Sequence, residues 1–279
     1  MGEPRSAPAR WVEVGDGVLV RRYDELDLSL GLVLGRDACL VIDTGGDAGQ
    51  GAEWAAAVRS VTANPWRVLL THAHFDHSFG TAAFLPCPVL SHPGCRAELV
   101  ADGETQRTEW VRQYRVEGKP EIADRIAATR LVLPDSMLSG RTELDLGGRT
   151  VVLDSFGLGH TDHDVVAHVP DADVVFVGDL VENGAPPAFD GSYPATWPAA
   201  LSSVLDLTGP ATTVVPGHGD PVDRSFVAAQ RADIVAVGIL CAAVLTGDIG
   251  EDDALRRSPF PGDTTRAALR ALAERDRKP

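Results

Sequence analysis

The chain has 279 residues, of which 40 are acidic and 25 are basic, so its formal net charge is −15. Hydrophobic residues make up 44% and charged residues 23% of the sequence, which are ordinary globular values and exclude disordered, collagen-like and coiled-coil classes. The acidic balance argues against a nucleic-acid-binding protein, because a surface that follows phosphate groups must be basic.

Cysteine usage and hydropathy indicate a cytoplasmic location. The four cysteines (Cys39, Cys87, Cys95 and Cys241) form no CxxC pair, so we expect reduced core residues. The N-terminal segment MGEPRSAPAR is polar and lacks signal-peptide character. Residues 234–245 are the longest uncharged apolar run, shorter than the roughly 20 residues of a membrane helix. We therefore expect a buried helix there and no membrane partner.

The first seventy residues predict strands around one helix. Strands are expected at residues 11–14, 18–22, 28–35, 38–44 and 66–71. Asp16-Gly17 supplies the positive-φ turn of a hairpin between the first two strands. Residues 48–61 are rich in alanine and have apolar side chains at helical spacing, which predicts a helix.

The rest of the chain repeats this arrangement after a helical stretch at residues 94–130. Further strands are expected at residues 142–146, 149–156, 164–169, 173–178 and 212–216, and helices at 197–207 and from 220 onward. Strand blocks followed by helices predict a layered α/β sandwich rather than an alternating doubly wound sheet. We expect one domain, 1–279, with a helical insertion at 94–130 and a helical C-terminal extension at 220–279.

Three histidines and an aspartate follow the predicted strand at residues 66–71. His72, His74, Asp76 and His77 form the pattern H-x-H-x-D-H. His72 and His74 are two residues apart, so on an extended segment their side chains point the same way. Imidazole nitrogens with a carboxylate are typical of a zinc site, with iron or manganese as alternatives.

Single candidate ligands follow three later strands. His160, Asp179 and His218 each stand beside a glycine where a predicted strand ends. Each alone is more often a turn residue, but strand-end loops at one sheet edge converge. The seven residues divide into a first site of His72, His74 and His160, a second of Asp76, His77 and His218, and Asp179 as a bridge. Two divalent ions would share a water whose pKa falls toward neutrality, and Asp76 would hold the resulting hydroxide and protonate the leaving group.

The motifs LVIDTGG, THAHFDHSFG, FGLGHT, FVGDL and VPGHG resemble, in this order, those of the metallo-β-lactamase superfamily of metal-dependent hydrolases. The resemblance covers roughly residues 18–220. It implies a four-layer αβ/βα sandwich, with two mixed β-sheets packed face to face and helices outside. It also implies the ligand assignment above. Asp43, in the first motif, is expected to fix the metal-site loops by hydrogen bonds without binding metal.

Departures from known branches leave the substrate unassigned. By this resemblance, Asp179 occupies the position at which class B1 lactamases carry a cysteine. An aspartate there points to the glyoxalase II-like branch. Glyoxalase II itself typically shows GHTxGH, where this chain has His163 and Asp164 at the last two positions. His163 is expected to be a loop histidine bonded to nearby backbone. Tyr193 and Trp197 are candidates for lining a substrate pocket, and packing against the sheet is the alternative for Trp197.

The leading hypothesis is a zinc-dependent hydrolase that uses a metal-bridging hydroxide on an ester, thioester, lactone or lactam carbonyl. We expect two divalent ions and a small-molecule substrate, and consider a homodimer. The resemblance also allows a mononuclear-iron persulfide dioxygenase or a phosphodiesterase. A non-enzymatic scaffold is disfavoured because all seven ligand positions are present.

Overall fold

The computed structural model describes residues 9–276, which divide into two compact units. Unit 1 holds the chain up to Asp154 together with Val169–Ala172. Unit 2 holds Ser155–His168 and the chain from Asp173 onward. The four candidate ligands of the H-x-H-x-D-H pattern lie in unit 1, and the other three lie in unit 2.

Unit 1 is a β-rich unit with helices between its strands. Its strands are β1 (Arg10–Gly15), β2 (Val18–Arg22), β3 (Ser29–Leu34), β4 (Cys39–Ile42), β5 (Trp66–Leu69), β6 (Val89–Ser91), β7 (Ser136–Met137), β8 (Thr142–Asp145) and β9 (Thr150–Asp154). Its helices are α1 (Ala48–Val61), α2 (Phe75–Ser78), α3 (Pro93–Val116) and α4 (Pro120–Ala128), with 3-10 turns at η1 (Glu25–Asp27), η2 (Phe79–Phe84) and η3 (Pro170–Ala172).

The remaining elements, mostly helical, follow in the second part of the chain. They are β10 (Val166–Val169), β11 (Val174–Glu182), α5 (Trp197–Asp206), β12 (Thr213–His218), α6 (Arg224–Leu245), α7 (Glu251–Arg257) and α8 (Gly262–Asp276). The predicted helical stretch at 94–130 is therefore the pair α3 and α4, and the residues after 220 form α6 to α8.

The strands form two mixed sheets, as predicted. One has the order β1-β2-β3-β4-β5-β6-β7 and the other the order β12-β11-β10-β9-β8. In the first sheet β3 pairs antiparallel with β4, whereas β4 and β5 are parallel. In the second, β8 and β9 are antiparallel, whereas β11 and β12 are parallel.

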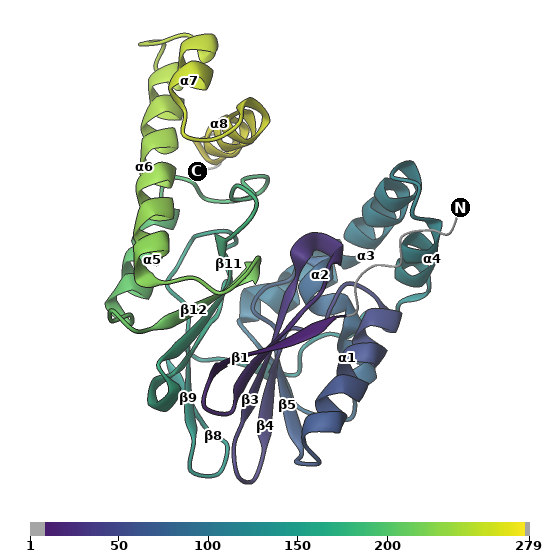
Figure 1. The fold of residues 1–279 in the computed structure, drawn as a ribbon. Helices are drawn as coiled ribbons and strands as arrows, with labels where there is room; N and C mark the ends of the chain where they lie inside the picture. The colour runs from purple at the N-terminus through teal and green to yellow at the C-terminus, as the bar shows by residue number, and fades with distance from the viewer. Residues whose placement is uncertain (1–8, 277–279) are drawn as a thin grey trace, which may run out of the picture. The chain divides into compact units, whose positions relative to one another are not determined.

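Helix α1 is the crossover that makes β4 and β5 parallel. It begins after Asp47, whose carboxylate accepts the N–H groups of Gly49 (2.7 Å) and Gln50 (2.9 Å) as an N-cap. Trp54 and Val58 are fully buried against the sheet, alongside which α1 lies in Figure 1. Parallel strands end at the same edge, so the residues that follow β4 and β5 lie close together.

Helix α3 packs against the segment that follows β5. The ring of Phe75, at the start of α2, stacks on Trp110 with centroids 4.2 Å apart, and Tyr114 lies edge-on at 6.4 Å. Tyr114 also donates a hydrogen bond to Glu25 (3.1 Å). Helix α3 thus supports the H-x-H-x-D-H segment directly.

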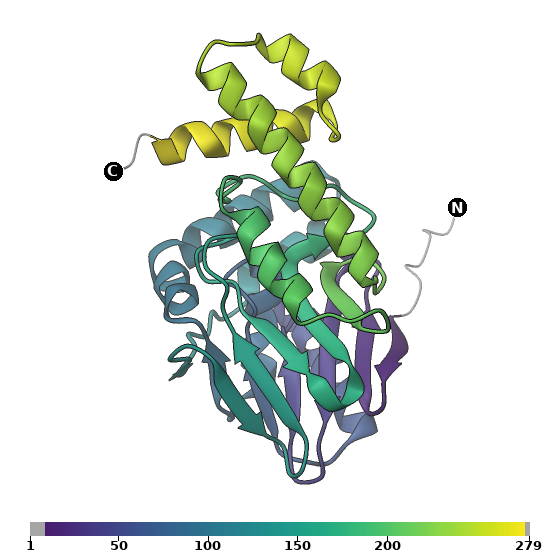
Figure 2. The ribbon, with the colours of Figure 1, turned by 90° about the vertical axis from the view of Figure 1, so that its left-hand side faces the viewer.

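Unit 2 has its own apolar core around β11, whose nine residues are all buried. Helix α5 packs Leu201 and Val204 into this core, and α6 runs beside α5, as Figure 2 shows. Helix α6 contributes Val227 and Ile234 to the same core.

Among residues 9–276, α6 alone is long and apolar enough to span a membrane, with a mean hydropathy of 1.7 over its most apolar 18 residues. Length and composition are weak evidence, since core helices of soluble proteins share them. The prediction of a buried helix is confirmed for one face only, because 33% of that window is buried and Ile239 is 64% exposed.

Candidate metal site

Four of the candidate ligands lie in unit 1, just after the end of β5, and we call them the unit 1 half-site. The chain passes through His72 and His74 and then turns into the one-turn helix α2, which contains Asp76 and His77. His72, Asp76 and His77 are buried, and His74 is half-buried. Buried imidazoles are costly unless their nitrogens have partners, so the contacts of each ring are informative.

His72 and His74 point their nitrogens at each other. The Nε2 atom of His72 lies 3.1 Å from Nδ1 of His74, and Nδ1 of His72 lies 3.0 Å from the Thr71 hydroxyl. Two nitrogens that each bind a tetrahedral zinc ion at about 2.0–2.1 Å lie roughly 3.3–3.4 Å apart. The observed spacing is close to that value and fits one shared cation.

Asp43 fixes the same segment from the end of β4. Its Oδ1 accepts the Thr71 N–H (2.8 Å), and its Oδ2 accepts the Thr71 hydroxyl (2.8 Å) and lies 2.8 Å from His77 Nδ1. If Nδ1 is protonated and held by this carboxylate, Nε2 of His77 would be the nitrogen that binds a metal, an arrangement common around metal-bound histidines. The predicted hydrogen bonds from Asp43 to this segment are confirmed.

The three candidate ligands in unit 2, which we call the unit 2 half-site, gather around Asp179. Its Oδ2 atom lies 3.6 Å from Nε2 of His160 and 3.4 Å from Nε2 of His218. His160 and Asp179 are buried, and the His218 side chain is 13% exposed. One carboxylate oxygen therefore faces two imidazole nitrogens that come from different segments of the chain.

The position of Asp179 differs from the prediction. The sequence places it after a strand, but it lies inside β11, whose pairing with β12 is irregular between Gly178 and Glu182. Gly178 has a φ of 52°, which favours glycine and turns the strand locally. A Cβ on Gly217 would lie 1.8 Å from Asp179 Oδ1, so a glycine in β12 makes room for this carboxylate.

His160 is held by the loop at residues 183–196. Its Nδ1 lies 3.3 Å from the Ala188 carbonyl oxygen, which leaves Nε2 directed at Asp179. The ring also packs against Trp197, with centroids 5.6 Å apart. Trp197 is fully buried and donates its indole N–H to the Leu180 carbonyl (3.1 Å), so the packing alternative is the correct one for this residue.

Two further residues near His160 are explained by the structure. Asp164 accepts hydrogen bonds from the Thr161 N–H (2.9 Å) and hydroxyl (2.6 Å), which closes the turn after His160. Burial raises the pKa of Asp164 to about 7. His163 is buried with Nδ1 2.6 Å from the Asp162 carboxylate, and its N–H donates to the Thr161 hydroxyl. Sequence reasoning missed the support that Asp164 gives to this turn.

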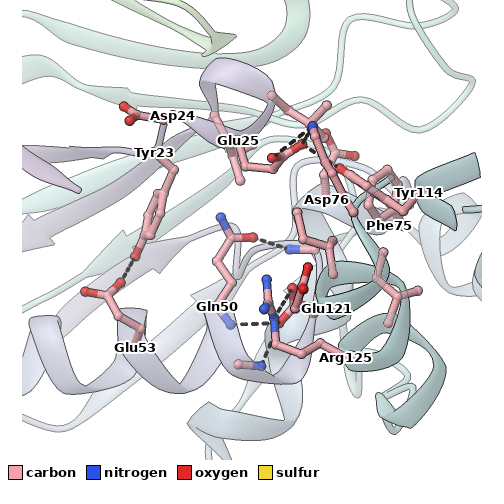
Figure 3. Close-up of a pocket in the computed structure, with 18 of the residues that line it drawn as sticks. Tyr23, Asp24, Glu25, Gln50, Glu53, Phe75, Asp76, Tyr114, Glu121 and Arg125 are labelled. Carbon is pink, nitrogen blue, oxygen red and sulfur yellow. Dashed lines mark hydrogen bonds and ion pairs between the residues drawn. The ribbon is translucent and has the colours of Figure 1, made fainter. Parts of the chain in front are cut away.

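A cavity of about 870 Å³ opens beside Asp76 in unit 1. Figure 3 shows Tyr23 and Glu53 on one side of it and Phe75, Asp76 and Tyr114 on the other. Its charged lining residues are the carboxylates Asp24, Glu25, Asp47, Glu53, Asp76 and Glu121 and the cations Arg21, Lys119 and Arg125.

Each cation of this cavity already has a carboxylate partner. The pairs are Arg21 with Glu53, Lys119 with Glu25 (2.9 Å) and Arg125 with Asp47 (3.1 Å). Carboxylates therefore outnumber cations in the wall, and no cationic group among the described lining residues lacks an acidic neighbour.

The donor atoms in both units suit a divalent metal ion. His72 with His74, Asp76 with His77, and His160 with Asp179 each offer ligand atoms within 4.8 Å of each other. Neutral imidazole nitrogens and carboxylate oxygens are the ligands that zinc and its neighbours in the series prefer. The free cysteines contribute nothing to these clusters, and burial raises the pKa of Cys95 to about 12.

Two known proteins are similar to this chain over most of its length. The chain is 28% identical over 192 residues to the probable metallo-hydrolase YqgX of Bacillus subtilis (strain 168), covering 67% of this chain and 82% of that protein. It is 28% identical over 254 residues to the acyl-coenzyme A thioesterase MBLAC2 of Bos taurus, covering 84% of this chain and 89% of that one.

Structural comparison gives the same fold. The metallo-β-lactamase from Pontibacter korlensis superposes with a TM-score of 0.64 at 19% identity, covering 81% of this chain and 99% of that one. The sequence profile of the Metallo-beta-lactamase superfamily matches residues 28–218, a range that includes all seven candidate ligands. The chain therefore belongs to the metallo-β-lactamase superfamily.

Proposed function

We propose that this chain is a metal-dependent hydrolase in which the two half-sites form one dinuclear centre. His72, His74 and His160 would hold one ion, Asp76, His77 and His218 would hold the other, and Asp179 would contribute to both. When bound, such ions act as Lewis acids and lower the pKa of a water molecule so that it attacks a carbonyl carbon. Zinc is the metal we expect, because the donors are histidine nitrogens and carboxylate oxygens.

The observation that best supports this proposal is the carboxylate of Asp179 between two imidazoles. A single aspartate oxygen 3.4–3.6 Å from two Nε2 atoms is the arrangement expected of a ligand shared by two cations. The family match over residues 28–218 supports bringing all seven positions into one centre.

Side chains of the protein have three tasks in this reaction. Asp43 holds Nδ1 of His77, so that Nε2 is the nitrogen that would bind metal. Asp76 orients the attacking water and passes a proton to the leaving group, a role suited to a carboxylate that lines the cavity. Phe75, stacked on Trp110, keeps this segment in place.

The cavity beside Asp76 is proposed to bind the substrate. Its volume of about 870 Å³ is within the roughly 300–1,000 Å³ range of small-molecule sites. Because one relative is a thioesterase, a thioester is the first substrate class to test. The excess of carboxylates favours a cationic or neutral substrate group in this cavity over a phosphate.

The test combines metal analysis with a hydrolysis assay. We expect two zinc ions per wild-type chain and metal-dependent hydrolysis of a short-chain thioester. Asp179→Asn should lose at least one ion and most of the activity, whereas the control Asp206→Asn, at an exposed position of unit 2, should change neither. Two ions retained by Asp179→Asn would refute the shared ligand. If the chain instead binds one iron ion and consumes oxygen, the result would contradict the hydrolase and favour a dioxygenase.

A further inference from the structure

The helices after residue 220 have no role in the metal chemistry proposed above, yet they reach the surroundings of His160. The connection runs through the loop at residues 183–196, between β11 and α5. The loop contacts His160 on one side and the C-terminal helix α8 on the other, and all of these residues belong to unit 2.

On the metal side, the loop and the start of α5 contact His160 in three ways. The Ala188 carbonyl oxygen lies 3.3 Å from His160 Nδ1. The Tyr193 N–H donates to the carbonyl of Gly159, next to His160 in the chain (3.0 Å). The backbone N–H of Trp197 donates to the Tyr193 carbonyl (2.9 Å), and the Trp197 ring packs against the imidazole of His160. The loop therefore fixes both the tautomer and the orientation of this histidine.

On the helical side, Arg275 of α8 holds the loop. Its guanidinium lies 3.8 Å from the centre of the Tyr193 ring, a cation–π contact. It also donates hydrogen bonds to the carbonyls of Gly191 and Ser192. A planar group that stacks and donates at once fixes its partners more firmly than a flexible point charge does.

A second contact from the C-terminal region is apolar. Phe260, between α7 and α8, packs edge-on against Phe189 with centroids 5.7 Å apart. Phe189 is buried and packs in turn against Trp197 at 5.5 Å. A continuous line of rings therefore leads from Phe260 to His160.

We propose that α8 and the segment before it hold the metal-binding histidine in position, an arrangement that we call the brace. Arg275 and Phe260 are its positioning residues, and they act on His160 through loop 183–196. This inference rests on the proposed function, because it takes His160 to be a metal ligand. It gives the C-terminal helices a role within unit 2, the unit that contains His160.

Zinc affinity, measured by chelator competition without substrate, tests the brace. Arg275→Ala should weaken binding of one ion about 10–100-fold, the range typical for residues that support a metal ligand. Arg275→Lys should restore part of this loss, since it can still donate to the two carbonyls. The matched control is Arg266→Ala on the same helix, whose partners are Glu251 and Asp263 and not the loop; it should stay within about two-fold.

A double variant separates positioning from general destabilisation. If Arg275 acts through His160, then Arg275→Ala in a His160→Ala background should cause no further loss of zinc affinity. Should Arg275→Ala fail to fold, Tyr193→Leu removes the stacked ring and makes the same prediction. Wild-type affinity in the folded Arg275→Ala protein overturns the brace alone. Absence of any bound divalent metal ion from the wild-type chain overturns the proposed function itself.

Discussion

The two half-sites present similar donor groups but are assembled in different ways. In unit 1 four candidate ligands lie within six consecutive residues at the end of β5, and Asp43 fixes them from the neighbouring strand. In unit 2 three candidate ligands come from three separate segments, and glycines and a loop make room for them and orient them.

This difference teaches where each half-site is vulnerable. The unit 1 half depends on local geometry and one buried carboxylate. The unit 2 half depends on close backbone approach at Gly217 and on contacts that reach as far as α8. Remote substitutions should therefore damage the unit 2 half more readily.

The largest effect is expected for Gly217→Ala. The new Cβ would lie 1.8 Å from Asp179 Oδ1, so the carboxylate or the strand must move. We expect zinc affinity to fall on the order of 100-fold or more and stability to fall by about 1–3 kcal/mol, measured by chelator competition and denaturant unfolding. The control Gly250→Ala adds a Cβ with nothing within 4 Å. Unchanged zinc affinity in Gly217→Ala would show that Asp179 does not need its observed position.

A smaller effect is expected in unit 1 for Asp43→Asn. The amide can still accept the Thr71 N–H, but it cannot hold the protonated Nδ1 of His77 as a charged partner. Zinc affinity should fall about 10–100-fold in a titration, with the fold retained by circular dichroism. Asp16→Asn, in an exposed turn of the same unit, serves as the control. If Asp43→Asn binds zinc with the wild-type titration curve, the proposed role of Asp43 in supporting His77 is wrong.

The smallest effect concerns the charge of the cavity. For one acyl group, we expect kcat/KM to fall in the order acylthiocholine, acyl-N-acetylcysteamine, acyl-coenzyme A. Glu121→Gln should reduce the preference for the cationic thioester about 2–5-fold, as one partly exposed charge does, and less at high salt. Glu143→Gln, exposed on β8, is the control. A preference for the coenzyme A thioester in the wild type would contradict the cavity's role while leaving metal-dependent hydrolysis intact.

Much of the fold was readable from local signals. Helix 48–61 is predicted with its observed bounds because it is rich in alanine and its apolar residues repeat at helical spacing. The Asp47 cap, which the structure shows, was not used in that prediction. The short strands β6 and β7 were not predicted, since three- and two-residue strands leave little periodicity.

For the site, the contiguous pattern from His72 to His77 was readable because local geometry suffices to gather it. The strand location of Asp179 was not, because it depends on irregular pairing with β12. The link from Arg275 to His160 was also invisible, since it passes through ring and carbonyl contacts between residues far apart in sequence.

The central claim is that His74 in unit 1 and His160 in unit 2 bind the same ion. The most direct test is a zinc titration of His74→Ala, His160→Ala and the double variant. If the claim holds, each single variant loses the same one of two ions, and the double variant still binds one. Loss of two separate ions in the double variant, with additive effects on affinity, would contradict the account.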